Sequence, residues 1–375
     1  MKAFVTGGTG FIGRQVVHKL VQRGYSVLAL VRSERGAAEL QSAGAQVVWG
    51  DITDRESMRE GMQGCDMVFH IAAWYKIGAR RQEMAERINV TGTRNVLELA
   101  YELGIPKIMY TSTVAVYGNT RGIVADETYR MPSDKPFISN YDRTKWLAHY
   151  EVALPLIAKG APITIVLPGA VFGPGDHSLV GDMMRAFYKG WLFLFPGPET
   201  VLSFTHVDDI AEGHILAAEK GKPGESYIIT GPVLSLRQAA AMWAQVSGRP
   251  LPLGYVPARL LHPIVPLSDW LGERIAAWPQ LFSSDAIRIT GACYAAQSCK
   301  AQRELNWYPR SLEEGFKDTF DAIAQQAADK TQAGLLGAVP ELHAVSAKKR
   351  KFTTGMIISA ALGMLLFWKL ARRRK

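Results

Sequence analysis

A tyrosine and a lysine four residues apart are the residues of this sequence best suited to chemistry. Among its 13 tyrosines, only Tyr141 is followed by a lysine at this spacing, Lys145, which would place both on one helical face. A free phenol, with a pKa of about 10, is a poor acid–base group at neutral pH. A nearby ammonium favours the phenolate and lowers that pKa. The pair therefore predicts proton transfer, with Thr113 or its neighbour Ser112 donating a hydrogen bond to a substrate oxygen. A surface Y-x-x-x-K that arose by chance is the alternative.

A glycine-rich turn follows the first predicted strand. Residues 2–6 (KAFVT) form a short apolar, β-prone run, and the glycines behind it lead into a helical pattern of apolar residues. Glycines permit a tight turn and let backbone N–H groups approach a pyrophosphate, whose charge the helix N-terminus stabilises. Because the pattern comes directly after a strand, it predicts a dinucleotide site built on Gly7, Gly10, Phe11, Ile12 and Gly13.

The end of the second predicted strand, 27–31, bears on which dinucleotide is bound. A site for the unphosphorylated cofactor places an acid there, on the ribose hydroxyls. Here Val31 occupies that position and Arg32 follows it. An arginine suits a 2′-phosphate, so NADP(H) is favoured over NAD(H). The alternative is that Arg32 is a solvated loop residue.

Apolar strand segments alternate with amphipathic segments along the first half of the chain. Further strands are predicted at 46–49, 67–70, 107–111 and 163–167, with helical segments such as 83–103 between them. The alternation predicts an α/β fold with a Rossmann-type doubly wound parallel sheet. The rest of the chain is predicted to add a smaller C-terminal substrate domain and a C-terminal transmembrane helix. Ligand chemistry then belongs at the C-terminal ends of the strands.

Four parts are predicted along the chain. An NAD(P)-binding Rossmann domain covers 1–168, with contributions from about 204–230, and a mainly substrate-binding domain covers 169–325. Residues 326–351 are predicted to be a tether, and 352–370 a membrane anchor helix.

The anchor prediction rests on Phe352–Trp368, a run of 17 residues without a charge between two basic clusters. Such a helix spans roughly 25 Å, and snorkelling lysines can cover the shortfall from a core of about 30 Å. A packed terminal helix is the alternative. Gly355, Ser359 and Gly363 line one helical face, which suggests a homodimer. The localisation predicted is therefore membrane-anchored, with the catalytic body in the cytoplasm.

The net charge of +9 also belongs to this tail. Nine basic residues and no acidic residue follow Glu341, so the rest of the chain is balanced and does not look like a nucleic-acid binder. The three cysteines, Cys65, Cys293 and Cys299, form no C-x-x-C or zinc-like cluster, which favours a reducing compartment and predicts no metal site.

Several further motifs together resemble one family. They are TGGTGFIG at 6–13, GDITD at 50–54, HIAA at 70–73, NVTGTRNVL at 89–97, YTSTVAVYG at 110–118, YDRTK at 141–145, LPGAVFGPGD at 167–176 and FTHVDDIAEGH at 204–214. The chain resembles the extended short-chain dehydrogenases/reductases, the NAD-dependent epimerase/dehydratase superfamily. Its nearest branch is that of the 3β-hydroxysteroid dehydrogenases and dihydroflavonol reductases. The resemblance covers roughly residues 1–325.

The resemblance implies roles for individual residues. Tyr141 would be the general acid–base, Lys145 would orient the ribose, and the hydroxyl that polarises the substrate would fall on Thr113. Asp51 and Ile52 would contact adenine, Ala72 and Ala73 would line the cofactor, and the segment after Pro168, with Val171, would meet the nicotinamide amide.

The branch is indicated by three departures from the sugar-nucleotide enzymes. Nucleotide-sugar epimerases resemble this chain but carry an Asn before V-x-G-P, where Ala170 stands here, and an Arg that binds diphosphate, where Leu202 stands here. The acidic pair of the sugar dehydratases is replaced by Val114 and Ala115. Losing a polar anchor and a charge-assisted donor weakens diphosphate binding.

Two long apolar stretches, 191–196 and 255–282, lie in the predicted substrate domain. They fit either ordinary core packing or an apolar pocket for a lipophilic molecule such as a sterol, triterpenoid or flavonoid-like compound. The sequence thus predicts a membrane-tethered NAD(P)-dependent oxidoreductase that interconverts a secondary alcohol and a ketone. A nucleotide-sugar epimerase and a non-catalytic, cofactor-bound subunit are the alternatives.

Overall fold

The computed structural model describes residues 1–75, 82–132, 136–275 and 279–336. Met1–Gln325 form one compact unit, and the residues from Gln326 onward belong to a second unit. The functional residues predicted from the sequence, apart from those of the tether and anchor, all lie in the first unit.

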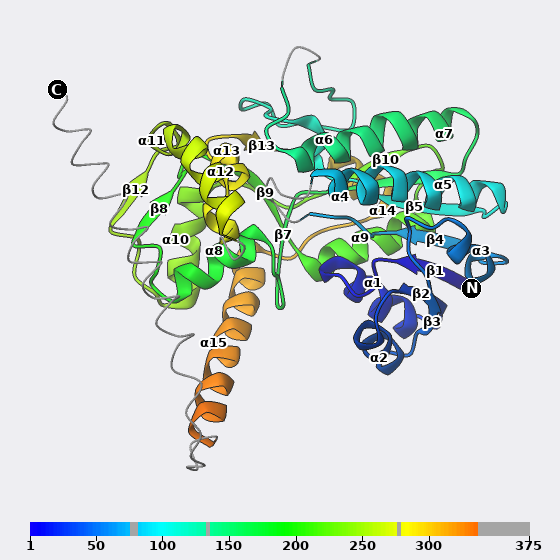
Figure 1. Ribbon diagram of the computed structural model, residues 1–375, viewed down its shortest axis with the longest axis horizontal. Coiled ribbons are helices and arrows are strands. Elements are labelled where there is room, and N and C mark those ends of the chain that lie inside the picture. Colours follow the sequence, from blue (N-terminus) through cyan, green and yellow to red (C-terminus); the bar gives the residue numbers. More distant parts are fainter. Residues whose placement is uncertain (76–81, 133–135, 276–278, 337–375) are drawn as a thin grey trace. The chain divides into compact units, whose positions relative to one another are not determined.

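Seven parallel strands form the central sheet of this unit (Figure 1). Their order across the sheet is β10-β6-β5-β4-β1-β2-β3. The chain places β2 and β3 on one side of β1 and the other four strands on its other side. The strands are β1 (Lys2–Thr6), β2 (Ser26–Val31), β3 (Gln46–Trp49), β4 (Met67–His70), β5 (Lys107–Thr111), β6 (Ile163–Pro168) and β10 (Ser226–Ile229).

The predicted Rossmann-type sheet is therefore confirmed. The strands predicted at 46–49, 67–70 and 107–111 have these bounds, while β2 begins one residue earlier and β6 ends one residue later than predicted. Strand β10 lies at the edge beside β6, with Ile229 opposite Pro168.

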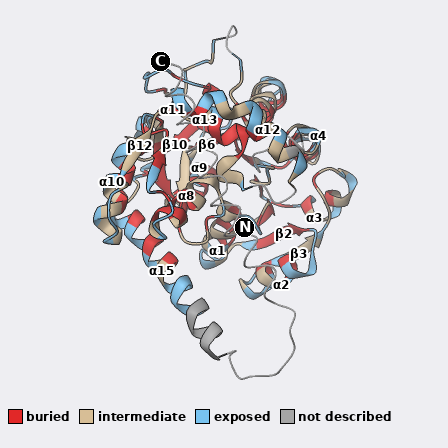
Figure 2. Cartoon of the chain, turned by 60° about the vertical axis from the view of Figure 1, so that its left-hand side comes forward, coloured by how far each residue is buried: buried red, intermediate tan, exposed pale blue. Residues whose placement is uncertain are grey.

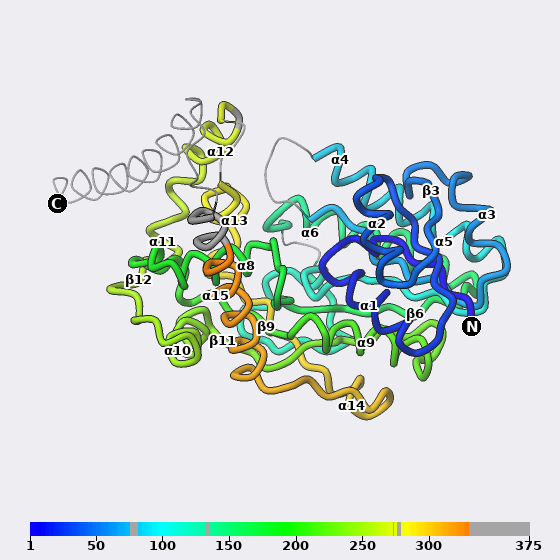
Figure 3. The backbone as a smooth tube through the Cα atoms, turned by 90° about the horizontal axis from the view of Figure 1, so that it is seen from below, coloured from blue at the N-terminus to red at the C-terminus, as the bar shows by residue number. Residues whose placement is uncertain are grey.

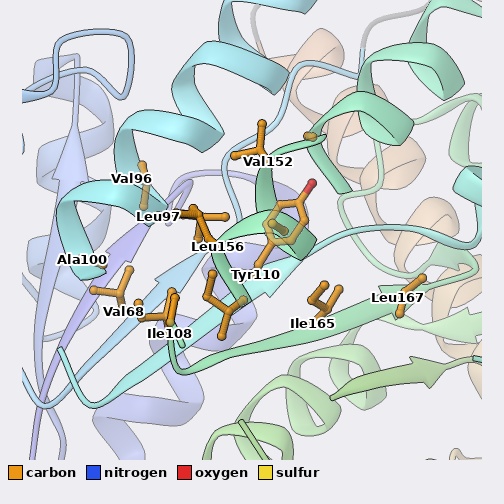
Figure 4. Close-up of a cluster of buried hydrophobic side chains, with 14 of the residues drawn as sticks. Val68, Val96, Leu97, Ala100, Ile108, Tyr110, Val152, Leu156, Ile165 and Leu167 are labelled. Atoms are coloured by element: carbon orange, nitrogen blue, oxygen red, sulfur yellow. The ribbon is translucent and has the colours of Figure 1, made fainter. Parts of the chain in front are cut away.

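Alternating side chains of the strands point to opposite faces of the sheet, and each face has its own core. Phe4 and Tyr110 face one layer, whereas Val5 and Met109 face the other. Figure 4 shows part of the first core, where side chains of α5 and of the 147–158 region meet those of β4, β5 and β6. On this side lie η1 (Glu56–Met58), α3 (Arg59–Met62), α4 (Gln82–Glu86), the π-helical turns η3 (Arg87–Gly92) and η5 (Leu147–Ala153), α5 (Thr93–Glu102), α6 (Asn140–Trp146) and α7 (Leu154–Ala158).

The opposite face of the sheet is covered by four of the described helices, which come from widely separated parts of the sequence. The longest of them, α9, lies against α1, and its buried residues Ile210 and Ile215 pack with Val17 and Leu20. The helices are α1 (Phe11–Gln22), α2 (Glu34–Ser42), α9 (Val207–Lys220) and α14 (Cys299–Leu305).

Smaller sheets and helices gather at the C-terminal ends of β5 and β6. In Figure 3, β12, α10 and α11 lie together on the side away from α1 and α3. The strands pair in the order β11-β9-β13, with β7 also on β9, and β12 pairs with β8. These elements are η4 (Val114–Tyr117), β7 (Ala170–Phe172), α8 (Leu179–Tyr188), β8 (Leu194–Pro196), β9 (Val201–His206), β11 (Val233–Ser235), α10 (Leu236–Ser247), β12 (Gly254–Val256), α11 (Ala258–Leu261), η6 (His262–Ile264), α12 (Val265–Arg274), η7 (Gln280–Phe282), α13 (Ser284–Ile289), β13 (Cys293–Tyr294) and α15 (Leu312–Leu336).

An aromatic core holds these smaller elements together. Phe316 on α15 is fully buried and packs on Phe172, Phe204 and Trp243, whose ring centroids lie 4.5, 5.8 and 6.1 Å from its own. Figure 2 shows the buried residues as bands along the interior faces of the elements, including α8 and α10. Such aromatic pairs add to the stabilisation by buried area.

The predicted membrane anchor is corrected. Among the helices that the structure describes, none is both long and apolar enough to cross a bilayer. The longest, α15, has 25 residues, but Glu313, Glu314 and Lys317 lie within its first turns, and charges are costly in a bilayer. The fold is thus a Rossmann-type sheet with smaller sheets and without a transmembrane helix in its described part, and the membrane-anchored localisation is not retained. The segment 352–370 itself lies outside the described residues, as does the tether beyond residue 336.

Candidate active site

The glycine turn after β1 leaves no room for a side chain at Gly7 or Gly13. Gly7 has φ +76°, and a Cβ on it would lie 2.6 Å from the backbone nitrogen of Ala72. A Cβ on Gly13 would lie 2.1 Å from the carbonyl oxygen of Gly7. The turn closes with a hydrogen bond of 2.9 Å from the N–H of Gly10 to that same oxygen. Bare backbone is therefore needed at the turn and at the first helical turn behind it.

This turn leaves an anion-binding surface at the start of α1. Gly10 is the N-cap and has no side chain to cap the helix, so the first N–H groups, which include those of Phe11 and Ile12, receive no side-chain cap. Phe11 and Ile12 are both partly buried. Uncapped N–H groups and the helix dipole suit a pyrophosphate, so the residues present fit a dinucleotide.

The two alanines after β4 and the end of β6 lie at the same edge of the sheet. Ala72 is partly buried beside Gly7, its N–H donating to Oγ1 of Thr6 at 3.4 Å, while Ala73 is exposed. Pro168 ends β6, where its carbonyl oxygen accepts a long hydrogen bond of 3.5 Å from Thr113. Val171, on β7, is partly buried. These residues therefore surround the site from three strands.

Arg32 and Asp51 are paired with each other in the structure. The guanidinium of Arg32, with 65% of its side chain exposed, lies 3.2 Å from the carboxylate of Asp51. Partial burial acts to raise the pKa of Asp51, but hydrogen bonds from Thr53 and Arg32 hold it below its ordinary value. The pair is therefore an ion pair at neutral pH, on the rim where an adenosine ribose would lie.

Ile52 does not join this rim through its side chain. It is 6% exposed, and a Cβ on Gly92 would lie 2.7 Å from its terminal methyl, so its side chain packs into the core. Its carbonyl oxygen accepts a hydrogen bond of 2.9 Å from Asn95. Only its backbone N–H remains as a polar group for the predicted adenine contact.

Helix α6 carries Tyr141 and Lys145 one turn apart. Ser139 caps the helix, its hydroxyl accepting from the N–H of Asp142 at 3.1 Å. Tyr141 is partly buried, whereas Lys145 is only 3% exposed. The ammonium donates to the carbonyl oxygen of Thr111 at 2.7 Å, which anchors it to the end of β5.

The charges of the pair differ from the sequence expectation. Burial raises the pKa of Tyr141, and the neighbouring Asp142 raises it further, against a hydrogen bond with Thr113 that lowers it. Burial also lowers the pKa of Lys145 to about 7. The net pKa of Tyr141 is therefore raised rather than lowered, because burial is the largest influence on the phenol. The phenol is protonated and able to donate.

The structure distinguishes the two candidate hydroxyls. Oγ of Ser112 lies 2.9 Å from Nδ1 of His149, and both residues are buried. The hydroxyl of Thr113 lies near the phenol of Tyr141 and acts to lower its pKa, and it caps η4 by accepting from the N–H of Ala115 at 3.2 Å. The structure therefore brings Thr113, rather than Ser112, to the phenol.

A carboxylate that the sequence reading passed over lies beside Tyr141. Asp142 is 3% exposed and accepts hydrogen bonds of 2.9 Å from Ser139 and from Tyr294 on β13. Burial raises its pKa to about 6. A charged residue at the third position of a helix gave no signal of burial, because its partner Tyr294 lies 152 residues away.

Polar groups near Tyr141 include a second phenol and an ion pair. Burial, with the charges of Asp176 and Asp182, raises the pKa of the Tyr75 phenol, and the cation of Arg185 opposes that shift. Arg185 donates to the backbone of Asp176 and, at 2.7 Å, to the carboxylate of Asp182. The sequence had indicated an apolar wall, and this ion pair on α8 was missed.

The two apolar stretches were expected to form either core or an apolar pocket, and their residues differ in burial. In 191–196, Leu192 and Phe195 are buried, whereas Trp191, Phe193 and Leu194 are about half exposed. Core packing thus accounts for part of each stretch, and a surface role remains available to the rest.

The comparisons with known proteins agree with this geometry. The sequence profile of the NAD dependent epimerase/dehydratase family matches residues 3–230. The chain is 33% identical to a 4-hydroxy-2-methyl-3-oxo-4-farnesyl-3,4-dihydroquinoline-1-oxide ketoreductase of Stigmatella aurantiaca, over 87% of this chain and 96% of that protein. It is 31% identical to sterol demethylase protein B of Methylococcus capsulatus, over 85% and 97% respectively.

Solved structures and more distant relatives extend this likeness. The crystal structure of gox2253 has a TM-score of 0.74 at 33% identity, covering 86% of this chain and 98% of that one. UDP-glucose 4-epimerases at 23–24% identity share the fold. Other relatives carry the names 3-beta-hydroxysteroid dehydrogenase, 3beta-hydroxysteroid-dehydrogenase/decarboxylase and putative dihydroflavonol 4-reductase. These names belong to the branch predicted from the sequence.

The glycine turn makes a first prediction. Gly13→Ala should cost about 1–3 kcal/mol of folding stability, because its methyl group collides with backbone, and should displace the turn that receives the pyrophosphate. Gly24→Ala is the matched control, since Gly24 has φ +78° but nothing within 4 Å of an added Cβ. We expect both variants to lose stability in urea unfolding, and only Gly13→Ala to lose NAD(P)H binding. Equal cofactor binding in the two variants would contradict this role.

The buried lysine makes a second prediction. The pKa of Lys145 is lowered from 10.5 to about 7, so between these pH values the unfolded chain binds a proton that the folded chain does not. Its contribution to the free energy of unfolding therefore rises with pH through this window. The difference between the wild type and Lys145→Met, from urea unfolding without cofactor, should rise by at most about 1.4 kcal/mol per pH unit. A difference that does not change with pH would show that Lys145 titrates normally.

Proposed function

This chain belongs to the NAD dependent epimerase/dehydratase family, and we propose that it interconverts a secondary alcohol and a ketone on a lipophilic substrate. Because its relatives include named reductases and dehydrogenases, it is an NAD(P)-dependent oxidoreductase of the extended short-chain type. The substrate class and the roles of individual residues are the content of the proposal.

The observation that carries the proposal is the convergence of Tyr141, Thr113 and Lys145 at the ends of β5 and α6. The hydroxyl of Thr113 lies near the phenol, so a substrate oxygen placed between them can accept a hydrogen bond from each. Tyr141 donates its proton to that oxygen as the ketone is reduced, and takes it back as the alcohol is oxidised. The nicotinamide, when bound, supplies or accepts the hydride.

Lys145 holds the cofactor's ribose in this proposal. An ammonium has three N–H groups. Two of them are used by the carbonyl oxygen of Thr111 and the hydroxyl of Tyr110, at 2.7 and 3.4 Å. The third N–H group is left for a ribose hydroxyl. The two hydrogen bonds already formed would fix the direction in which this third N–H group points.

A lipophilic substrate is supported by two residues on the substrate side and by the names of relatives. Ala170 on β7 and Leu202 on β9 are partly exposed apolar residues, and neither can bind a diphosphate. One relative is named for a farnesyl-bearing quinoline and another for a sterol. The ion pair of Asp182 and Arg185 would then contact a polar end of an otherwise apolar molecule.

A nucleotide-sugar epimerase is the competing function, because it would use the same residues for a transient oxidation. The experiment is to follow NAD(P)H absorbance with the purified chain and a panel of lipophilic ketones, secondary alcohols and sugar nucleotides. Net consumption of NAD(P)H with a lipophilic ketone supports the proposal. Conversion of a sugar nucleotide to its epimer without net change in NAD(P)H would establish the alternative.

Replacement of the proton donor makes a third prediction. Tyr141→Phe removes only the hydroxyl and should lower kcat by at least about 100-fold, the usual contribution of a general acid–base. NAD(P)H binding should be retained, since the phenol is not assigned a cofactor contact. Tyr101→Phe, which removes the hydroxyl of a tyrosine 38% exposed on α5, is the control and should turn over normally. Full activity in Tyr141→Phe would remove Tyr141 from the mechanism.

The preference for NADP(H) makes a fourth prediction. We propose that Arg32 turns from Asp51 toward the 2′-phosphate, exchanging one ion pair for another on an exposed rim. Arg32→Ser should then raise KM for NADPH by about tenfold, in line with a charge-assisted hydrogen bond, and leave KM for NADH nearly unchanged. If KM for both cofactors responds equally, Arg32 does not read the 2′-phosphate.

A further inference from the structure

Lys145 lies in a buried polar cluster that the proposed mechanism uses only in part. Its ammonium is 3.4 Å from the hydroxyl oxygen of Tyr110, a long hydrogen bond, and 5.0 Å from the centroid of that ring. Tyr110 is 1% exposed and Lys145 is 3% exposed. A buried ammonium needs fixed acceptors, because leaving one of its donors unpaired costs more than the bond itself gains.

The phenol of Tyr110 stands off β5 toward this lysine. Figure 4 shows the ring rising from the strand with its oxygen at the far end, next to the 147–158 region. On the neighbouring strand, His70 stacks on the ring, with the centroids 5.8 Å apart and the planes 17° from parallel. The ring is thus held from the side by His70, and both the ring and its hydroxyl lie near the ammonium of Lys145.

Polar groups continue from Tyr110 to the glycine turn. The hydroxyls of Ser112 and Thr93 lie near its phenol and act to lower its pKa, against the larger effect of burial. Thr93 lies 2.9 Å from Nε2 of His70, whose Nδ1 lies 2.8 Å from the hydroxyl of Thr6. Thr6 is the last residue of β1, directly before Gly7. Buried polar groups therefore extend from Lys145, through the stacked rings of Tyr110 and His70, to the turn that is expected to receive the pyrophosphate.

We propose that Tyr110 is a positioning residue for Lys145, and that its hydroxyl holds the ammonium where it can bind the cofactor's ribose. The inference rests on the proposed function, since it assigns the ribose to Lys145. Tyr110 itself touches neither cofactor nor substrate in this proposal.

The donors and acceptors of the chain are consistent with this role. Burial lowers the pKa of His70 and of His149 to about 3, so both rings are neutral and each offers one acceptor nitrogen. Thr6 can donate to Nδ1 of His70, Nε2–H of His70 to Thr93, and Ser112 to Nδ1 of His149. With these tautomers the hydroxyl oxygen of Tyr110 keeps a lone pair for Lys145.

The same surroundings give the sign of a pH effect. The titratable groups facing Lys145 are Tyr110 on β5, His70 on β4, His149 on η5 and Tyr141 on its own helix. The histidines are neutral and the pKa of each tyrosine is raised, so none of them supplies a counter-charge. Removing the acceptor at Tyr110 therefore disfavours the charged form of Lys145 further.

The test compares Tyr110→Phe with the wild type and with Tyr227→Phe. Tyr227 is equally buried, on β10 of the same sheet, and loses a hydroxyl that bonds with Glu304 far from the cluster. The dissociation constant of NAD(P)H is measured by fluorescence over a series of pH values. We expect about tenfold weaker binding for Tyr110→Phe, the effect of one hydrogen bond to a charged group, and wild-type binding for Tyr227→Phe.

The pH dependence separates positioning from a general loss of packing. In the wild type, binding weakens as Lys145 loses its proton, and in Tyr110→Phe that midpoint should move to lower pH. A variant that is only less well packed would bind more weakly without moving the midpoint, and that result, or wild-type binding at every pH, would overturn the inference. The failure of the proposed function looks different: the wild type would bind NAD(P)H with this pH profile yet turn over no lipophilic alcohol or ketone.

Discussion

The burial of one ammonium is the constraint on which the candidate site depends. Lys145 lies 3% exposed inside an α/β sheet, and burial brings its pKa down to about 7. Such a group is tolerated only where acceptors are already in place. The carbonyl oxygen of Thr111 and the hydroxyl of Tyr110 meet this need, and both belong to β5. The position of the lysine is therefore set by a strand end rather than by its own flexible stem.

The parallel register of the sheet brings the remaining parts to the same edge. Thr6 pairs with His70, His70 with Tyr110, and Thr111 with Val166, so the four strands end together. The residues that follow these ends supply the glycine turn, Ala72, Ser112–Thr113 and Pro168. Because parallel strands align their C-terminal ends, groups far apart in sequence become neighbours without any long connection.

The substrate side is of mixed character. Ala170 and Leu202 leave no group for a diphosphate, while Asp182 and Arg185 form an ion pair whose charges reach Tyr75. A molecule that is apolar over most of its length, with one polar end, would match both features.

The sequence alone was enough to predict the Rossmann sheet, because alternating short apolar runs and amphipathic segments leave few other ways to bury their apolar faces. It also predicted the glycine turn and the Tyr141–Lys145 pair, since both depend on spacing within one turn or one helix. Tertiary structure decided whether Thr113 or Ser112 meets the phenol, because that choice depends on His149 capturing one of them. It also decided the charges of the pair, since desolvation depends on what packs around a group rather than on its neighbours in sequence. Tyr110 and Asp142 could not be singled out beforehand, because their roles come from partners brought by other strands and helices.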